Sequence, residues 1–251
     1  LRSVRLREVQ ASGGSVLFVS SRSAAHSTSV GESAEVTLAA HGADYRPQSM
    51  DCREALSQKM SKHPDSLCIP ADDSFSRRLI DWQRRHGRHD LPWQNTRDAY
   101  RIWLSEIMLQ QTQVSTVIPY YERFLDRFPG IAELAAAPLE SVLELWSGLG
   151  YYARARNLHR CAQALLADHG GAFPQAPERI AELPGIGRST AAAIAVFAFG
   201  ARAAILDGNV KRVLARCFGI DGFPGSVATE KVLWQLAESL LPSTAIEAYT
   251  Q

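Results

Sequence analysis

From about residue 73 to its end, the sequence predicts an all-α protein. Apolar residues recur there at helical spacing, the connections are short and carry Pro or Gly, and no stretch alternates well enough to be a strand. At 46% hydrophobic residues, the chain has enough apolar material to bury a core. We therefore expect one helical domain over residues 73–251.

Residues 1–72 differ from the rest because they are rich in Ser, Ala and Gly and show little periodicity. We expect an extension, largely disordered, to which no function is assigned. Three other interpretations stay open: a tag-like extension, an upstream stretch that is not normally translated, and a transit peptide.

The helices follow in order from residue 74. Asp73 or Ser74 is suited to cap the first and Asp98 the second, while Pro119 falls near a start or a bend of the third. The pattern predicts helices at 74–87, 98–111, 113–128, 139–146, 151–168, 188–199, 209–218 and 228–241, with a short one at 178–183.

The most informative local feature is the run LPGIGRST, which lies between the short helix and an alanine-rich one. Gly185 and Gly187 permit the positive φ values of a tight reversal, and they let a ligand approach the backbone. Free N–H groups at such a turn and at the following helix start can hold an anion. An ordinary helix C-cap is the alternative; for Arg188, phosphate contact and a solvated surface charge are equally open.

Bulk charge does not explain an affinity for nucleic acid, because the formal net charge is only +1. Binding to a polyanion must therefore use local clusters. Two candidates each fall largely on one helical face: Arg154, Arg156 and Arg160, and Lys211, Arg212 and Arg216. A solvated helix face is the alternative for each cluster. No apolar run is long enough to span a membrane. The cysteine spacings fit no CxxC or zinc pattern, so we expect no metal bound by this chain.

Two carboxylates stand out. Glu106 lies amid the apolar helix YRIWLSEIML, where burial would raise its pKa towards the range of a general acid; the alternative places it on a narrow polar stripe with Ser105. Asp207 precedes the basic helix NVKRVLARC and is suited to cap it, a role compatible with facing a ligand. The polar run Gln110, Gln111 and Thr112 suits contact with bases and phosphates.

Four segments in order, SEIMLQQTQV, GLGYYARARNL, LPGIGRSTAAAI and ILDGNVKRVLARC, resemble the MutY-like adenine DNA glycosylases of the helix–hairpin–helix superfamily. The resemblance covers about residues 74–251. It implies two helical subdomains flanking a DNA-binding cleft, and a reaction that removes adenine mispaired with 8-oxoguanine or guanine from double-stranded DNA after flipping the nucleotide out.

The resemblance also implies roles for individual residues. Glu106 matches the general acid, Asp207 the carboxylate that stabilises the cationic sugar, and Asn209 a residue supporting the pair. Contacts to DNA are implied for Gln110, Gln111, Thr112, Tyr151, Arg154, Gly185, Gly187, Arg188, Ser189 and Lys211. Positions around the adenine pocket are matched by Leu91, Trp93, Leu109 and Gln251.

Ser189 stands where related bifunctional enzymes carry a lysine nucleophile. Serine cannot form the Schiff base that strand cleavage uses, so the resemblance implies a monofunctional glycosylase. Family members continue into a four-cysteine loop that holds a [4Fe–4S] cluster. The cysteines here do not match it, so we expect a truncated or partial chain whose full-length parent carries the cluster.

Two competing functions remain: a non-catalytic DNA-binding fragment with the same hairpin, and a related mismatch glycosylase such as one acting on thymine. We expect a monomer that associates with no membrane. The expected place is the bacterial cytoplasm with the nucleoid, or the mitochondrion or nucleus of a eukaryote.

Overall fold

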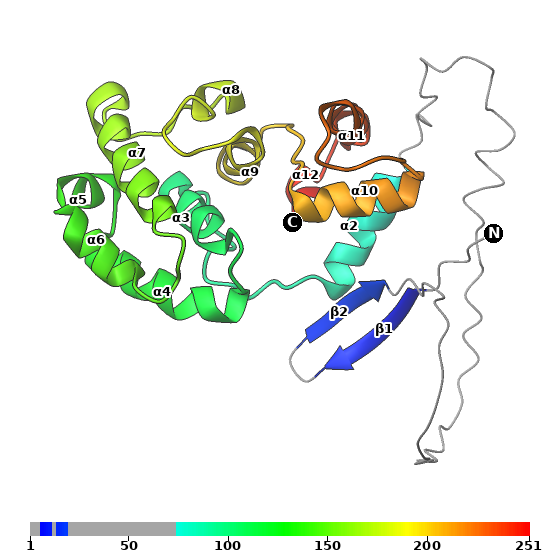
Figure 1. Cartoon of the computed structure of the whole chain (residues 1–251), viewed down its shortest axis with the longest axis horizontal. Coiled ribbons are helices and arrows are strands. Elements are labelled where there is room, and N and C mark those ends of the chain that lie inside the picture. The colour runs from blue at the N-terminus through cyan, green and yellow to red at the C-terminus, as the bar shows by residue number, and fades with distance from the viewer. Residues whose placement is uncertain (1–5, 12–13, 20–73) are drawn as a thin grey trace, which may run out of the picture. The chain divides into compact units, whose positions relative to one another are not determined.

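The computed structural model of the chain describes residues 6–11, 14–19 and 74–251, which fall in two units divided between Gln58 and Lys59 (Figure 1). In the first unit, β1 (Leu6–Ala11) and β2 (Gly14–Val19) pair antiparallel, with Leu6 opposite Val19. This hairpin lies in the segment to which no function was assigned. The other residues of 1–72 lie outside the described ones, so the expectation of disorder stays a prediction.

Every regular element of residues 74–251 is a helix, which confirms the all-α expectation for this unit. The helices are α2 (Ser74–His86), α3 (Ala99–Leu109), α4 (Val114–Arg127), α5 (Ile131–Ala136), α6 (Leu139–Trp146), α7 (Ala153–His169), α8 (Pro177–Ile180), α9 (Arg188–Phe199), α10 (Gly208–Phe218), α11 (Val227–Ser239) and α12 (Ile246–Thr250). None of these helices combines the length and the apolar character that a membrane span needs.

The helix starts follow capping chemistry where the sequence provides it. The side chain of Asp98 accepts a hydrogen bond from the Tyr100 N–H at 2.9 Å, and that of Ser226 accepts one from Thr229. The short helices α5 and α12 were not predicted, because six and five residues are too few to show a period of 3.6.

The first hydrophobic core surrounds α3. Trp103, Leu104 and Met108 have no exposed surface, and they share this core with Phe124 of α4 and Trp146 of α6. A helix that is apolar on most sides has to be enclosed by others, and α4, α7 and α9 pack against α3. A polar side chain on α3 is therefore held in a fixed, largely dry setting.

A second, smaller core forms from α10, α11 and the segment before α10. Leu206, Leu214, Leu233 and Leu236 are all buried in it. The Arg202 side chain ties the segment before α10 to the chain that follows α11, by donating to the carbonyls of Leu241 and Pro242 at 2.6 and 3.0 Å. The segment that leads into α10 is thus held by the second core and by Arg202.

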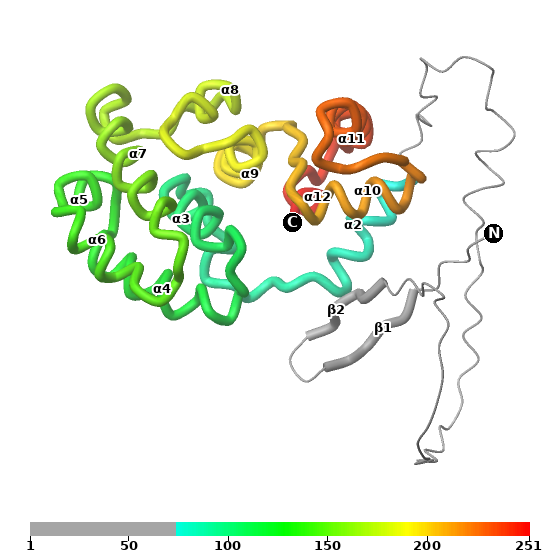
Figure 2. Tube along the Cα trace, viewed as in Figure 1, coloured from blue at the N-terminus to red at the C-terminus, as the bar shows by residue number. Residues whose placement is uncertain are grey.

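Helix α9 joins the two cores. It packs against α3 and α8 on one side and against α12 on the other, and Figures 1 and 2 show it between these helices. Its alanines, among them Ala191, Ala192 and Ala195, are buried and allow close approach. The turn that precedes α9 therefore lies where the two cores meet.

Candidate active site

Glu106 projects from the apolar helix α3. Its neighbours along the helix, Ser105 and Ile107, are buried, and Glu106 itself is partly buried. The Ser105 hydroxyl donates to the Ile102 carbonyl at 2.7 Å inside the helix. The alternative in which both residues form a solvated polar stripe is therefore wrong.

Burial is the larger cause and the negative charge of Asp207 the smaller one that together raise the pKa of the Glu106 carboxyl from 4.5 to about 7. A carboxyl with this pKa holds its proton in a substantial fraction of molecules at neutral pH, so it can donate one. The charge of Asp207 reaches Glu106 and is the second cause of the shift, so the two acids lie near each other.

Asp207 caps α10. Its Oδ1 accepts from the N–H groups of Asn209 and Val210 at 2.9 and 2.8 Å, and its Oδ2 accepts from the Asn209 side-chain amide at 3.4 Å. The exposed carboxylate is thus fixed by backbone and side-chain donors while remaining open to a ligand. Asn209 is oriented in turn by Arg212, which donates to its Oδ1. Capping and a site role are compatible here.

The reversal at Leu183–Ser189 rests on Gly185. Its φ of +77° lies in the left-handed region, and a Cβ built on it would lie 2.5 Å from the Cβ of Asn157 in α7. Leu183 and Ile186 are buried on either side of it. Gly185 is therefore required by the fold itself, through both its conformation and its contact.

Gly187 behaves differently, and the expectation that it needs a positive φ is wrong. It is the N-cap of α9 with φ −88° and ψ 168°, a conformation open to any residue. A Cβ built on it would meet no atom within 4 Å. Neither its conformation nor a close neighbour within 74–251 requires glycine here. The open space beside Gly187 leaves room for a ligand to approach the backbone. The N–H groups of the first turn of α9 have no partner within the helix, so the prediction that an anion binds at this end is compatible with the structure.

Arg188, the first residue of α9, turns to the surface of α11. Its guanidinium lies 3.7 Å from the centre of the Trp234 ring and pairs with Glu238. Stacking on Trp234 and pairing with Glu238 fold the Arg188 side chain onto α11. Of the two interpretations left open for Arg188, the structure favours a paired surface charge.

Arg154 does not face solvent as a phosphate contact would. From α7 its guanidinium donates to the carbonyls of Ile107 and Met108 at 2.8 and 2.9 Å, at the end of α3. It also donates to the carbonyls of Leu149 and Gly150 at 3.2 and 3.3 Å, and to the Thr112 hydroxyl at 3.2 Å. Arg154 thus links the end of α3 to the loop before α7, and its charge is used inside the protein.

The two segments that Arg154 links both carry strained, exposed residues. Gln111 has φ +57° and Tyr151 has φ +50°, and Tyr151 keeps 62% of its surface exposed. A non-glycine residue in the left-handed region costs about 1 kcal/mol or more and persists only where its surroundings impose it. The Trp146 indole, donating to the Gly150 carbonyl at 3.1 Å, adds to this constraint. Tyr151 is therefore held outward on a rigid loop.

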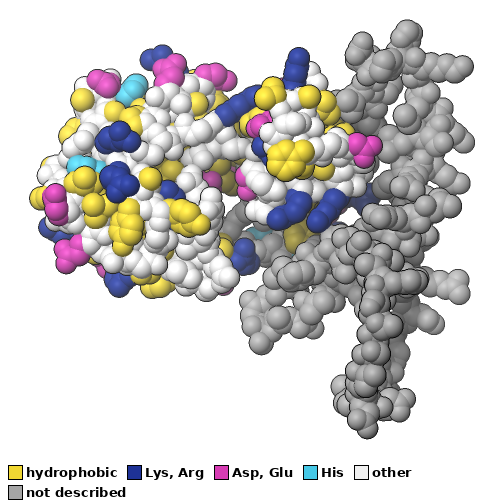
Figure 3. Space-filling view, viewed as in Figure 1, with side chains coloured by type: hydrophobic (Ala, Val, Ile, Leu, Met, Phe, Trp, Pro, Cys, Tyr) yellow, Lys and Arg dark blue, Asp and Glu magenta, His cyan; other side chains and the backbone are white. Residues whose placement is uncertain are grey.

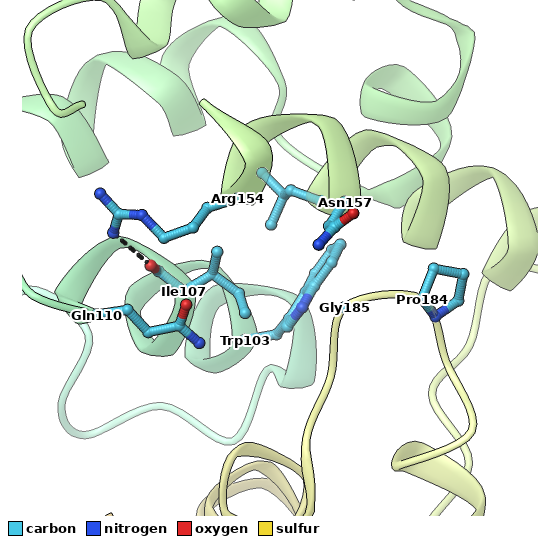
Figure 4. A pocket seen from close by; sticks show the side chains of 8 residues that line it. Trp103, Ile107, Gln110, Arg154, Asn157, Pro184 and Gly185 are labelled. Atoms are coloured by element: carbon cyan, nitrogen blue, oxygen red, sulfur yellow. Dashed lines mark hydrogen bonds between the residues drawn. The ribbon is translucent and has the colours of Figure 1, made fainter. Parts of the chain in front are cut away.

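A small cavity of about 30 Å³ lies between α3, α7 and the reversal. Gln110, Asn157 and Gly185 are among its lining residues, and Figure 4 shows the amides of Gln110 and Asn157 with Arg154 beside them. Asn157 was not predicted as part of the site. Its spacing of three from Arg154 puts the two on one face of α7, which is the signal that could have found it.

The structure gives the remaining predicted residues contacts of their own. Lys211 pairs with Glu230 of α11 at 3.0 Å, and the Gln251 amide oxygen accepts from Gln83 of α2 at 3.1 Å. Trp93 packs edge-on against Tyr121, with ring centres 5.4 Å apart. Leu109 also packs on the first core, and the Leu91 N–H donates to the Gln94 side chain at 3.0 Å. A common pocket for Leu91, Trp93, Leu109 and Gln251 stays a prediction.

Within residues 74–251, no group of three or more His, Cys, Asp or Glu side chains is placed to hold a metal ion. Cys161 is buried in the first core, and Cys217 is exposed on α10. These two cannot supply the four thiolates of an iron–sulfur cluster.

Lys and Arg side chains lie in several separate groups on the face in Figure 3, with acidic side chains among them.

Comparisons with known proteins point to one family. Residues 104–239 match the family model described as "HhH-GPD superfamily base excision DNA repair protein". The chain is 50% identical over 168 residues to the adenine DNA glycosylase of Buchnera aphidicola subsp. Baizongia pistaciae, covering 67% of this chain and 47% of that protein. It is 42% identical over 221 residues to the adenine DNA glycosylase of Mus musculus, covering 82% of this chain and 42% of that protein.

Among solved structures, a thermostable thymine-DNA glycosylase superposes with a TM-score of 0.65 at 31% identity, covering 70% of this chain and 81% of that one. The chain spans about half the length of the curated relatives it matches. The family match extends from the helix that carries Glu106 to the end of α11, and it includes the reversal and Asp207. The chain belongs to the HhH-GPD superfamily of base excision DNA repair proteins.

Proposed function

We propose that this chain is the catalytic part of a monofunctional adenine DNA glycosylase. The observation that carries the proposal is the pairing of Glu106, whose pKa is raised to about 7, with the fixed carboxylate of Asp207. Relatives at 50% and 42% identity that are named adenine DNA glycosylase support it.

The two acids suit hydrolysis of an N-glycosidic bond. Protonated Glu106 gives its proton to a ring nitrogen of the base, so that the bond from that base to C1′ of the sugar breaks with the electron pair leaving on the base. The sugar becomes an oxocarbenium-like cation, which the Asp207 carboxylate stabilises. A water molecule then adds its oxygen to C1′ and releases a proton, which the Glu106 carboxylate accepts. The products are free adenine and an abasic site.

Binding is assigned to surfaces around this pair. A phosphate lies at the N-terminus of α9 beside Gly187, and Tyr151 inserts into the duplex at the vacated position, with Gln110 and Gln111 next to it. Leu91, Trp93, Leu109 and Gln251 surround the flipped adenine. The partner is double-stranded DNA carrying adenine opposite 8-oxoguanine or guanine.

Strand cleavage is not part of the proposal, because Ser189 has no amine with which to form a Schiff base. The [4Fe–4S] cluster that the family implies is assigned to the whole protein. The two cysteines described within residues 74–251 do not fit it, and no step here passes through it. The protein is expected wherever its DNA lies, in the bacterial cytoplasm or in a eukaryotic mitochondrion or nucleus.

The test is a single-turnover assay of the protein expressed from its complete gene. Duplexes carry adenine opposite 8-oxoguanine, adenine opposite guanine, or thymine opposite guanine, and heat with alkali reveals abasic sites. The proposal is supported if adenine is released and the strand breaks only after treatment with alkali. Absence of adenine release from both adenine duplexes refutes it.

A second candidate, a glycosylase acting on thymine opposite guanine, is favoured by the likeness to the thermostable thymine-DNA glycosylase at 31% identity. Preferential release from the thymine duplex would establish this candidate instead. The third possibility, a binding module without catalysis, predicts salt-sensitive affinity for duplex DNA and no abasic product from any substrate.

A further inference from the structure

The segment Ala201–Leu206, which delivers Asp207 to the site, has no helix or strand of its own. Leu206 is buried with only 4% of its surface exposed, so its backbone N–H needs a partner inside the protein. That partner is the hydroxyl oxygen of Ser189, which accepts from the Leu206 N–H at 2.6 Å. The bond reaches from the first turn of α9 to the residue directly before Asp207.

Ser189 thus stands between two functional elements. It is the second residue of the helix whose N-terminus is the proposed phosphate site, and its hydroxyl fixes the entry of the chain into α10. The N-cap bonds of Asp207 orient the carboxylate relative to α10, whereas the Ser189 bond sets the backbone just before it. A carboxylate that stabilises a developing cation depends on placement to within a fraction of an ångström.

We propose that Ser189 is a positioning residue, whose hydroxyl holds Asp207 in register with the anion-binding end of α9. This assignment rests on the proposed function. Ser189 then has a structural task of its own, besides lacking the amine of a lysine nucleophile. One hydrogen bond between the two cores performs this task.

The experiment compares Ser189→Ala, Ser189→Thr and wild type in the full chain, with Thr190→Ala as a matched control that removes the adjacent hydroxyl of the same helix turn. Three quantities are measured: the hydrogen-exchange rate of the Leu206 amide, the single-turnover rate of adenine release, and Kd for the duplex. In Ser189→Ala we expect faster exchange at Leu206, base release slower by about five- to ten-fold, and Kd within about two-fold.

Ser189→Thr keeps a hydroxyl, so Leu206 protection and the rate of base release should both stay near wild type, as they should in Thr190→Ala. A role limited to stability would change the Leu206 exchange rate and leave the rate constant for base release unchanged.

Two results overturn the Ser189 assignment while leaving the glycosylase proposal intact: unchanged Leu206 exchange in Ser189→Ala, or faster exchange with unchanged base release. A threonine variant that protects Leu206 but loses the rate would overturn it as well. If wild type releases no base, both proposals fall, and Leu206 exchange still reports whether the hydrogen bond exists.

Discussion

Replacing Glu106 by Gln should make the folded protein more stable at alkaline pH. The structure places the carboxyl where burial and the charge of Asp207 disfavour its ionised form, and its pKa rises from 4.5 to about 7. Holding this group ionised in the folded state costs about 3 kcal/mol of unfolding free energy, from about 1.4 kcal/mol for each pH unit that separates the two values. Glutamine has nearly the same shape and never ionises, so the variant is spared this cost.

The sign of the pH dependence follows from proton binding. Below pH 4.5, Glu106 is protonated in both states and the cost is absent. Between pH 4.5 and about 7 the folded state keeps a proton that the unfolded state has lost, so wild-type stability falls as the pH rises. Above about pH 7 the full cost is present. The stability advantage of Glu106→Gln should grow from near zero at pH 4.5 to about 3 kcal/mol at pH 8.

Urea unfolding followed by circular dichroism between pH 4.5 and 8.5 measures this difference. Glu122 on α4 is exposed, so Glu122→Gln is the matched control for removing one carboxylate from the surface. A constant difference between wild type and Glu106→Gln over this range would refute the reasoning, because it would mean that Glu106 ionises in the folded protein as freely as in the unfolded chain.

Three further predictions concern the geometry around this acid. Asp207→Asn should keep the α10 cap and the melting temperature, because Asn caps helices as well as Asp, yet slow base release by about 100-fold or more; normal turnover in that variant would exclude Asp207 from the reaction. Gly185→Ala should lower the unfolding free energy by about 2 kcal/mol or more, through positive φ and the clash with Asn157. Gly187→Ala should lower it by about 1 kcal/mol at most, through the poorer N-cap, and weaken duplex binding. Equal effects of the two alanines on urea midpoints would contradict this division. Arg154→Lys should lower the unfolding free energy by about 2–4 kcal/mol in the same assay, because an ammonium cannot reach the five acceptors of the guanidinium. A loss of duplex affinity at unchanged stability would instead show that Arg154 contacts a phosphate.

Much of this fold could be predicted from the sequence because its helices are long and periodic. The helix that carries Glu106, the alanine-rich α9 and the Asp207 cap of α10 all lie within about two residues of their expected positions. Capping residues and apolar spacing act over a few residues, so they are visible in one dimension. The helices α5 and α12 could not be predicted in this way, because with six and five residues they are too short to show a helical period.

Site residues could be predicted where their role follows from the type of residue. They could not be predicted where the role depends on which other side chains they contact in the fold. The apolar residues around Glu106 marked it as a candidate acid, but the helical pattern alone left burial and a polar stripe with Ser105 both open. The arginines could not be assigned, because Arg154 and Arg188 look alike in sequence, while one donates to five protein acceptors and the other stacks on Trp234. Gly187 resembled Gly185 for the same reason: only tertiary contacts show which glycine the fold requires.

The pairing of Glu106 with Asp207 is tested most directly by titrating Glu106 with carboxylate-carbon NMR, in wild type and in Asp207→Asn. The account predicts a pKa of about 7 in wild type and a lower one in the variant, still above 4.5 because burial is the larger cause. A wild-type value near 4.5, or one that Asp207→Asn leaves unchanged, would contradict it.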